Sequence, residues 1–333
     1  MSDLAVQFKK TNTKHLDVAV IGDPMLDQYV HCDVAGISPE DDLAWKLRVV
    51  SSEYRAGGAA NVAMGLKALG ANVYLIGVTG SDSGSARLQA LLRESGVHAY
   101  FSRNTCDRRT TCKTRYLSRR GRQICRIDDE TKIDASVYDV KYITDSVWAR
   151  EYDAIVVSDY CKGTISRQVV DMLNRRKKMF FVDPKSSSLR FYGPNAFMFT
   201  PNAKEVRLLG GVSDKASLDV AIKRIPSLNH SAWILAKNGP AGASLWEGVN
   251  HRSLDGPYWK QRHYFAVRER TVGDPAGCGD SLLAALIFAS ACGWDIPLAC
   301  RLGVAAGACA YDQVGVKVVT RSELLAELGT FAY

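Results

Sequence analysis

Short apolar runs rich in β-branched residues recur along the chain, and segments whose apolar positions have helical spacing separate them. Such runs are typical of strands that are buried on both faces, as in parallel sheets. The predicted strands are 16–21, 73–76, 154–157, 179–182, 197–200 and 233–235, and the predicted helices are 59–69, 85–94, 166–175, 202–209 and 219–225. Strands that alternate with helices predict an α/β fold, a doubly wound and mostly parallel sheet with helices on both faces.

Two stretches interrupt this alternation with strand-like patterns that have no helix between them. The strands predicted there are 29–34, 43–50, 110–117 and 123–128, the last two as a hairpin. We expect them to form a small β-sheet lid, inserted at about 29–53 and 98–128 into a single domain that spans residues 1–333. The lid would cover the carboxyl edge of the main sheet, where ligands of this architecture bind.

Positive charge is concentrated in one segment. The chain has 43 Lys and Arg against 35 Asp and Glu, a net charge of +8, and residues 103–126 alone hold nine basic residues and one acidic residue. Such a density suits a solvated face, nucleic acid, a membrane surface or a phosphorylated small molecule. Because the segment offers only Tyr116 as a stacking aromatic, we expect no nucleic-acid partner.

Three further features concern the compartment. The longest apolar run, 282–292, is too short for a bilayer span of about 20 residues. The N-terminus lacks the apolar block of a signal peptide, and the nine cysteines include no C-x-x-C pair, which favours free thiols. These features predict a cytoplasmic protein with no membrane partner.

The strongest local motif is the segment 274–280 (DPAGCGD), which directly precedes an apolar helix predicted over 281–292. Gly277 and Gly279 at this junction would let backbone N–H groups converge at a helix N-terminus and bind a phosphoryl group. Asp280 could then accept the proton of an attacking hydroxyl. In isolation, the same residues also suit a tight turn with an N-cap.

Two other turns carry groups that suit a sugar. Gly57 and Gly58 begin the helix predicted over 59–69, and Asn61 one turn later could hydrogen-bond to hydroxyls. Asp27, in a turn after the first strand, could bind vicinal hydroxyls. Each turn in isolation also fits ordinary packing or turn formation.

These motifs occur in an order that resembles the ribokinase-like (PfkB) sugar kinases over nearly the whole chain. The matching segments are 22–27, 57–61, 158–163, 182–185, 200–205, 237–242 and 274–280. Within this family the segments 37–40 (ISPE), 158–163 (SDYCKG) and 182–185 (VDPK) are most similar to kinases of D-glycero-D-manno-heptose 7-phosphate, which form the 1,7-bisphosphate. Residues 41–45 (DDLAW) depart from the pattern of those kinases, as do Pro275, Ala276 and Cys278 from that of the family.

The resemblance implies a role for each matching residue. Asp280 would be the general base, beside an anion hole formed by Gly277, Cys278 and Gly279. The sugar would bind Asp27, Gly57, Gly58 and Asn61, and its phosphate would bind Lys113, Arg115, Arg126 and Lys185. ATP and Mg²⁺ would be held by Asn202, Glu205, Lys237, Gly239 and Gly242, with residues 305–310 beside the adenine. Asp274 matches the position near which family members bind a monovalent cation such as K⁺.

The sequence therefore predicts a phosphotransferase that uses ATP and an alcohol group as acceptor, with the C1 hydroxyl of heptose 7-phosphate as that group. We expect a homodimer assembled through the lid. The open alternatives are a kinase of another sugar phosphate, a free sugar or a nucleoside, a non-catalytic sugar-phosphate sensor, and a nucleic-acid-binding protein. A helix N-terminus favours a thiolate, so the sequence also predicts a lowered pKa for Cys278, against the alternative of an inert buried thiol.

Overall fold

The computed structural model describes most of the chain. The described residues are 3–12, 15–103, 107–185, 189–226, 232–249, 258–270, 273–312, 315–331 and 333. Within them, no helix has both the length and the apolar character that crossing a membrane requires. Eight of the nine cysteines belong to this part of the chain, and all eight are free thiols, whereas Cys106 lies outside it.

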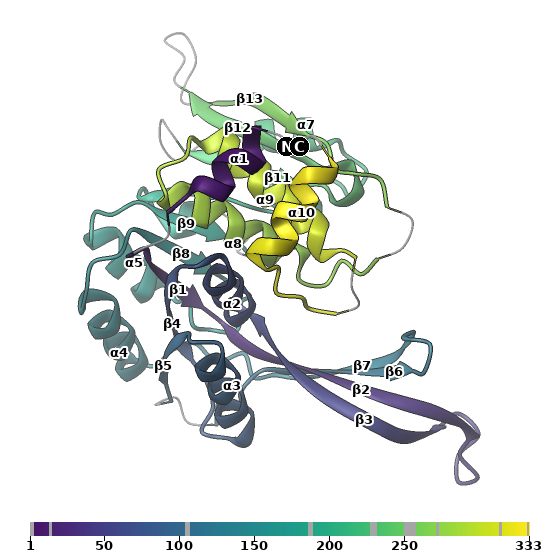
Figure 1. Cartoon of the computed structure of the whole chain (residues 1–333). Helices are drawn as coiled ribbons and strands as arrows, with labels where there is room; N and C mark the ends of the chain where they lie inside the picture. The colour runs from purple at the N-terminus through teal and green to yellow at the C-terminus, as the bar shows by residue number, and fades with distance from the viewer. Residues whose placement is uncertain are drawn as a thin grey trace.

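A large sheet crosses the middle of the molecule (Figure 1). Its strands are β1 Asp17–Gly22, β4 Asn72–Val78, β5 His98–Ser102, β8 Ala154–Ser158, β9 Phe180–Asp183, β10 Ala196–Phe199, β11 Trp233–Lys237, β12 Ala243–Val249 and β13 Tyr258–Phe265. Among the described residues the order is β13-β12-β11-β10-β9-β8-β1-β4-β5. The pairs from β5 to β11 are parallel, and β12 and β13 are antiparallel. This confirms the predicted mostly parallel sheet.

Helices cover both faces of this sheet. They are α1 Asp3–Lys10, α2 Ala59–Leu69, α3 Ser83–Glu94, α4 Val137–Trp148, α5 Arg167–Arg175, α6 Ala203–Leu209, α7 Leu218–Arg224, α8 Cys278–Ala291, α9 Ile296–Ala310 and α10 Arg321–Thr330. Because side chains alternate along a strand, Val18 and Val20 of β1 pack into one core with α2, α8 and α9. Ala19 and Ile21 pack into a second core with α4, α5, α6 and α7.

The lid is a separate small sheet that extends away from the body of the molecule (Figure 1). Its strands are β2 Pro24–Ile37, β3 Trp45–Gly58, β6 Cys112–Ser118 and β7 Gln123–Asp129, in the order β3-β2-β6-β7. The first two strands are longer than predicted, since β2 begins directly after β1 and β3 continues to the start of α2.

One boundary of the lid differs from the expected insertion at about 98–128. His98–Ser102 forms β5, which pairs in parallel with β4 at the edge of the large sheet. Its partly buried apolar side chains, Ala99 and Phe101, pack against the core that also contains α3. The lid therefore begins after β5, because this short apolar segment pairs with β4 and packs its side chains against the cores of the large sheet.

Candidate active site

The carboxyl ends of adjacent strands β1 and β8 are held together by the buried carboxylate of Asp23. This side chain accepts hydrogen bonds from the backbone N–H groups of Tyr160, at 2.8 Å, Lys162, at 3.1 Å, and Thr164, at 2.9 Å. A carboxylate with three such donors fixes the loop that follows β8. The loop therefore presents Tyr160 at the carboxyl edge of the large sheet in a defined position.

Asp280 lies in the first turn of α8 and is buried. The helix begins at Cys278, and its N-cap is Gly277, with a φ of 78° and no side-chain cap, so Asp280 is not the N-cap. Its carboxylate accepts hydrogen bonds from Asn61 Nδ2, at 2.8 Å, and from the Tyr160 hydroxyl, at 2.6 Å. Burial raises the pKa of Asp280 to about 6, against the two hydrogen bonds, which lower it.

The N-terminus of α8 faces the ammonium group of Lys237. A Cβ atom added at Gly279 would lie 3.4 Å from Lys237 Nζ, which in turn donates to Asp183 Oδ1 at 2.6 Å. Burial raises the pKa of Asp183, but the charges of Lys237 and Lys185 outweigh it and leave that pKa lowered. The Cys278 N–H already donates to the Pro275 carbonyl at 3.3 Å, and no side chain caps the helix. A helix start of this kind beside a cation suits a phosphoryl group.

Asn202 and Glu205 form the capping box of α6. One carboxylate oxygen of Glu205 accepts from the Asn202 N–H at 2.8 Å, and the other forms an ion pair with Lys185. Burial lowers the pKa of Lys185, but Asp183 and Glu205 outweigh it and raise that pKa overall. The structure thus places Lys185, which the sequence assigned to the acceptor phosphate, against a residue assigned to the nucleotide side.

The basic residues of the lid differ in their partners. The register of β6 and β7 pairs Lys113 with Asp128 and Arg115 with Arg126, so all four share one face. Arg115 forms an ion pair with the buried Asp27, and Arg126 pairs at 2.8 Å with Asp128 and is about half exposed. Lys113 makes no hydrogen bond or ion pair with any described residue, and burial lowers its pKa.

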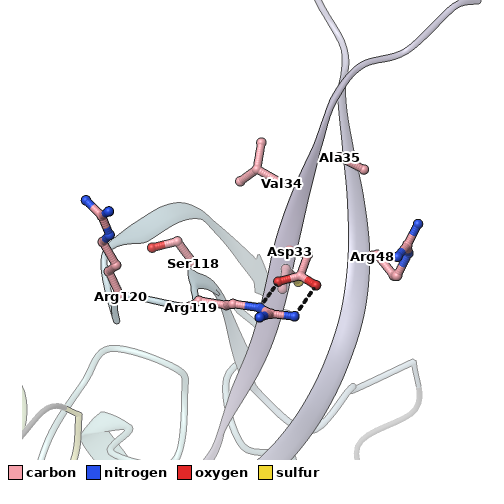
Figure 2. A pocket seen from close by; sticks show the side chains of 8 residues that line it. Asp33, Val34, Ala35, Arg48, Ser118, Arg119 and Arg120 are labelled. Atoms are coloured by element: carbon pink, nitrogen blue, oxygen red, sulfur yellow. Dashed lines mark hydrogen bonds and ion pairs between the residues drawn. The ribbon is translucent and has the colours of Figure 1, made fainter.

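Two other arginines of the basic segment lie further out along the lid (Figure 2). Arg119 forms an ion pair with Asp33, and Arg120 points away from it beside an open pocket that Arg48 also lines. Asp33 is six strand residues beyond Asp27, about 20 Å at the usual rise per residue. The positive charge of the segment is therefore divided between the base of the lid, near Asp27, and its outer part, near Asp33.

The predicted sugar-binding residues lie together at the base of the lid. A Cβ atom at Gly57 would be 1.9 Å from Asp27 Oδ2, and one at Gly58, where φ is 56°, would be 2.7 Å from the Asp23 carbonyl oxygen. Gly58 therefore requires glycine, whereas a side chain at Gly57 would displace the Asp27 carboxylate. Asn61 is buried, and its Oδ1 has no hydrogen-bond partner among the described residues, so it is available to a hydroxyl donor.

Asp274 fixes the loop that precedes α8. Its two carboxylate oxygens accept from the N–H groups of Ala276, at 2.9 Å, and Gly315, at 2.8 Å. Its carbonyl oxygen accepts from Cys278 Sγ at 3.5 Å. Burial, followed by the charges of Asp274 and Asp280, raises the pKa of Cys278 to about 12, so the expected lowering of this pKa is wrong.

Gly239 and Gly242 form the turn between β11 and β12. The Gly242 N–H donates to the Gly239 carbonyl at 2.9 Å, and a Cβ at Gly242, with φ 78°, would lie 2.0 Å from the Phe265 carbonyl oxygen. No hydrogen bond within the described residues joins these glycines to Asp280. Residues 305–310 belong to α9, where a Cβ at Gly307 would lie 3.1 Å from the carbonyl oxygen of Cys278.

Sequence reasoning gave no role to three residues of this site: Asp23, Tyr160 and Asp183. Each follows or ends a predicted buried strand, at 16–21, 154–157 or 179–182. Polar residues at the carboxyl ends of parallel strands converge on one edge of the sheet, and that position was the signal that could have found them.

The profile of the "pfkB family carbohydrate kinase" matches residues 16–321, and the chain belongs to that family. Two curated relatives are each called "Bifunctional protein HldE". The relative from Citrifermentans bemidjiense is 33% identical over 318 residues, which cover 93% of this chain and 63% of the relative. The relative from Helicobacter hepaticus is 32% identical over 329 residues, which cover 96% of this chain and 65% of the relative. The chain thus spans less than two thirds of the length of these relatives.

Solved structures with the same fold include two other kinases. Phosphofructokinase-2 from Escherichia coli, in complex with substrates and products, has a TM-score of 0.74 at 20% identity and covers 95% of this chain and 98% of its own. Ribokinase from Arabidopsis thaliana, complexed with ribose and ATP, has a TM-score of 0.67 at 19% identity, with coverages of 96% and 100%. The predicted ribokinase-like fold is confirmed.

Proposed function

We propose that this chain uses ATP to phosphorylate a sugar phosphate, D-glycero-D-manno-heptose 7-phosphate, at its C1 hydroxyl. The observation that carries the proposal is the buried Asp280 carboxylate at the uncapped N-terminus of α8, with Lys237 beside that helix start. The choice of a heptose rests on the resemblance of segments 37–40, 158–163 and 182–185 to heptose 7-phosphate kinases.

The reaction requires one proton transfer and one phosphoryl transfer. Asp280 accepts the proton of the acceptor hydroxyl as that oxygen bonds to the γ-phosphorus of ATP, the bond to the β,γ-bridging oxygen breaks, and ADP leaves. The N–H groups at the start of α8 and the ammonium of Lys237 stabilise the charge on the transferring group. A base with a pKa near 6 is charged at neutral pH yet basic enough to take part.

The donor set also suits the metal that ATP requires. Glu205 offers carboxylate oxygens beside the N-terminus of α6, and hard oxygen ligands are those that Mg²⁺ prefers. Glu205 and Asn202 would hold Mg²⁺ and its waters once Lys185 leaves its ion pair with Glu205. Bound there, Mg²⁺ would neutralise part of the charge of the ATP phosphates. We also propose that a K⁺ ion binds beside Asp274. Phosphofructokinase-2 from E. coli has been solved in complex with potassium.

Lys113 supports an acceptor that already carries a phosphate. A half-buried ammonium without an anionic partner among the described residues is costly, and a phosphate would supply that partner. Arg115 already has Asp27 and Arg126 already has Asp128. An unphosphorylated sugar would leave Lys113 without an anionic partner among the described residues.

The test is ATP consumption with a panel of acceptors that contains both anomers of heptose 7-phosphate, fructose phosphates, free hexoses and nucleosides. Lys113→Ala should raise the KM of the sugar phosphate about tenfold or more and leave the KM of ATP unchanged, because a charge-assisted hydrogen bond contributes about 1.5–3 kcal/mol. Arg126→Ala is the control and should have a smaller effect. A free sugar used as well as a sugar phosphate would overturn the proposed acceptor.

We also propose a homodimer assembled through the lid. The lid face opposite to Lys113 carries exposed apolar side chains: Val34 is 47%, Val49 59% and Ile127 54% exposed. Trp45, near the end of the lid, is 64% exposed. Apolar surface of this kind is typical of protein interfaces.

Light scattering after size exclusion measures the assembly. We expect a dimer for the unmodified chain and a monomer for Ile127→Glu and Trp45→Glu. Val137→Glu is the control, since Val137 is 67% exposed on α4, away from the lid, and should leave the dimer intact. A monomeric unmodified chain would contradict this assembly.

A further inference from the structure

Tyr160 contacts three groups that meet at the carboxyl edge of the large sheet. Its hydroxyl donates to Asp280 Oδ1 at 2.6 Å. The ammonium groups of Lys113, from the lid, and Lys185, from the segment after β9, lie 5.6 and 5.4 Å from the centroid of its ring. The mechanism described above uses Asp280 but gives Tyr160 no part.

We propose that Tyr160 is a positioning residue for Asp280, whose hydroxyl fixes the orientation of the catalytic carboxylate and stabilises its charged form. This inference rests on the proposed function, since it assigns a role around the same base. It adds a residue that acts through Asp280 and does not itself exchange a proton with the substrate.

The geometry of the carboxylate supports this role. Tyr160 holds Oδ1 and Asn61 holds Oδ2 at 2.8 Å, so the plane of the carboxylate is fixed from both sides. A carboxylate has about four lone-pair sites, and two donors leave room for the acceptor hydroxyl. Removal of one donor would free the carboxylate to rotate and would lower the fraction of productive orientations.

The hydroxyl of Tyr160 is a stable donor. Burial, followed by the charges of Asp280 and Asp183, raises the pKa of Tyr160 well above its ordinary value, so the hydroxyl keeps its proton. Its backbone is fixed as well, because the N–H of Tyr160 donates to Asp23 at 2.8 Å. A fixed neutral donor near a buried carboxylate favours the charged carboxylate.

Other charged groups also act on Asp280, and they set the background against which Tyr160 works. Asp183 raises the pKa of Asp280 and Lys237 lowers it, and Lys185 interacts with Asp280 from the segment after β9. Cys278, in the same turn of α8, is a neutral thiol whose pKa is about 12. Tyr160→Phe alters none of these side chains and keeps the ring that Lys113 and Lys185 face, so we expect their effect on Asp280 to stay the same.

The test compares the pH dependence of kcat for the unmodified chain and Tyr160→Phe, with ATP and whichever acceptor is active. A hydrogen bond to a charged group corresponds to roughly one pKa unit, so the rising limb near pH 6 should move up by about one unit. At pH 6 this shift lowers the charged fraction of the base roughly fivefold, whereas near pH 8 it has little effect. Any loss of kcat that comes from a misoriented Asp280 carboxylate would remain near pH 8. The KM of ATP should not change.

Tyr192→Phe is the matched control. The Tyr192 hydroxyl donates at 2.7 Å to Asp159, a buried aspartate in the loop that carries Tyr160. Burial raises the pKa of Asp159 to about 6. If Asp280 is the group that controls the rising limb, Tyr192→Phe leaves that limb in place. A limb that moves in Tyr192→Phe and not in Tyr160→Phe would overturn the proposal and assign the titration to Asp159.

A second measurement does not depend on turnover. Carboxyl resonances of ¹³C-labelled aspartate report the titration of Asp280 directly, and Asp280→Asn identifies its signal. We expect Tyr160→Phe to raise the titration midpoint of this signal, and an unchanged midpoint would overturn the inference. If the unmodified chain consumed no ATP with any acceptor, the proposed kinase function would fail, and this titration would still decide whether Tyr160 stabilises the charged carboxylate.

Discussion

Asp280→Asn should remove activity while leaving the fold as stable as before, or more stable, at neutral pH. The side-chain amide that this substitution introduces cannot accept from both Asn61 Nδ2 and the Tyr160 hydroxyl. However, Oδ1 of Asn61 has no partner among the described residues, so a half turn of the Asn61 amide lets that oxygen accept from the new N–H₂ group. Tyr160 keeps an oxygen acceptor, but the half turn moves Nδ2 of Asn61 to the position of the present Oδ1, which has no partner among the described residues, at a cost of about 1–3 kcal/mol.

The magnitude follows from the pKa of Asp280. Burial raises it from an ordinary value of 3.8 to about 6, so the folded state binds this proton more tightly than the unfolded state. The unmodified chain therefore loses stability as the pH rises from about 4 to about 6, and the loss is complete above that range. Two units correspond to about 3 kcal/mol at most, which the amide avoids. The unsatisfied Asn61 amide offsets part of this gain, so the net rise in Tm at neutral pH should be at most a few degrees.

Two assays test the reasoning. The kcat for ATP consumption should fall about 10²–10⁴-fold, as expected for loss of a general base. Thermal unfolding between about pH 4.5 and pH 8 should show Asp280→Asn gaining on the unmodified chain as the pH rises. A difference in Tm between the two chains that does not change over this range would show that the pKa of Asp280 is not raised by burial. Near-normal turnover would show that Asp280 is not the base.

Two further predictions test the surroundings of the site. Iodoacetamide near pH 8 should label the exposed Cys125 and leave Cys278 almost unmodified, because a thiol with a pKa of about 12 holds few thiolates; peptide mapping would show the reverse if the helix N-terminus dominated. Gly57→Ala should lower the free energy of unfolding in urea by roughly 1–3 kcal/mol and raise the acceptor KM, since its Cβ would displace Asp27. Gly329→Ala in α10 has open space around it and should be neutral or stabilising.

The core of the large sheet could be predicted from the sequence because its signals are local. The run 16–21 became β1 at Asp17–Gly22, and the helix predicted over 59–69 became α2 with the same bounds. The antiparallel strands β12 and β13 were not predicted, since neither has the continuous apolar run of a strand in a parallel sheet. β12 contains the polar Ser244 and Glu247, and β13, at the edge of the sheet, is mostly exposed. Strand pattern alone also could not separate β5 from the lid.

The sequence pointed to many residues of the candidate site but not to the contacts between them. The motif 274–280 predicted a helix from residue 281, and α8 begins three residues earlier, at Cys278. The pKa of Cys278 depends on burial and on carboxylates that a local motif does not reveal. Likewise, Arg115 pairs with Asp27, a residue 88 positions away in the chain. Contacts at that separation follow from the topology of the two sheets, and periodicity within one strand does not contain them.

The ion pairs of the site change what its positive charge means. Of the basic side chains that the sequence assigned to phosphates, Arg115 is paired with Asp27, Lys185 with Glu205 and Lys237 with Asp183. The binding free energy of a phosphate at such a group is only the difference between the new ion pair and the one that it replaces. The released carboxylate must then find another partner or solvent. Mg²⁺ at Glu205 would stabilise that released carboxylate, so binding of the metal with ATP would free Lys185 for an anion. Lys113 has no such pair to lose within the described residues, which is why its substitution should affect acceptor binding most directly.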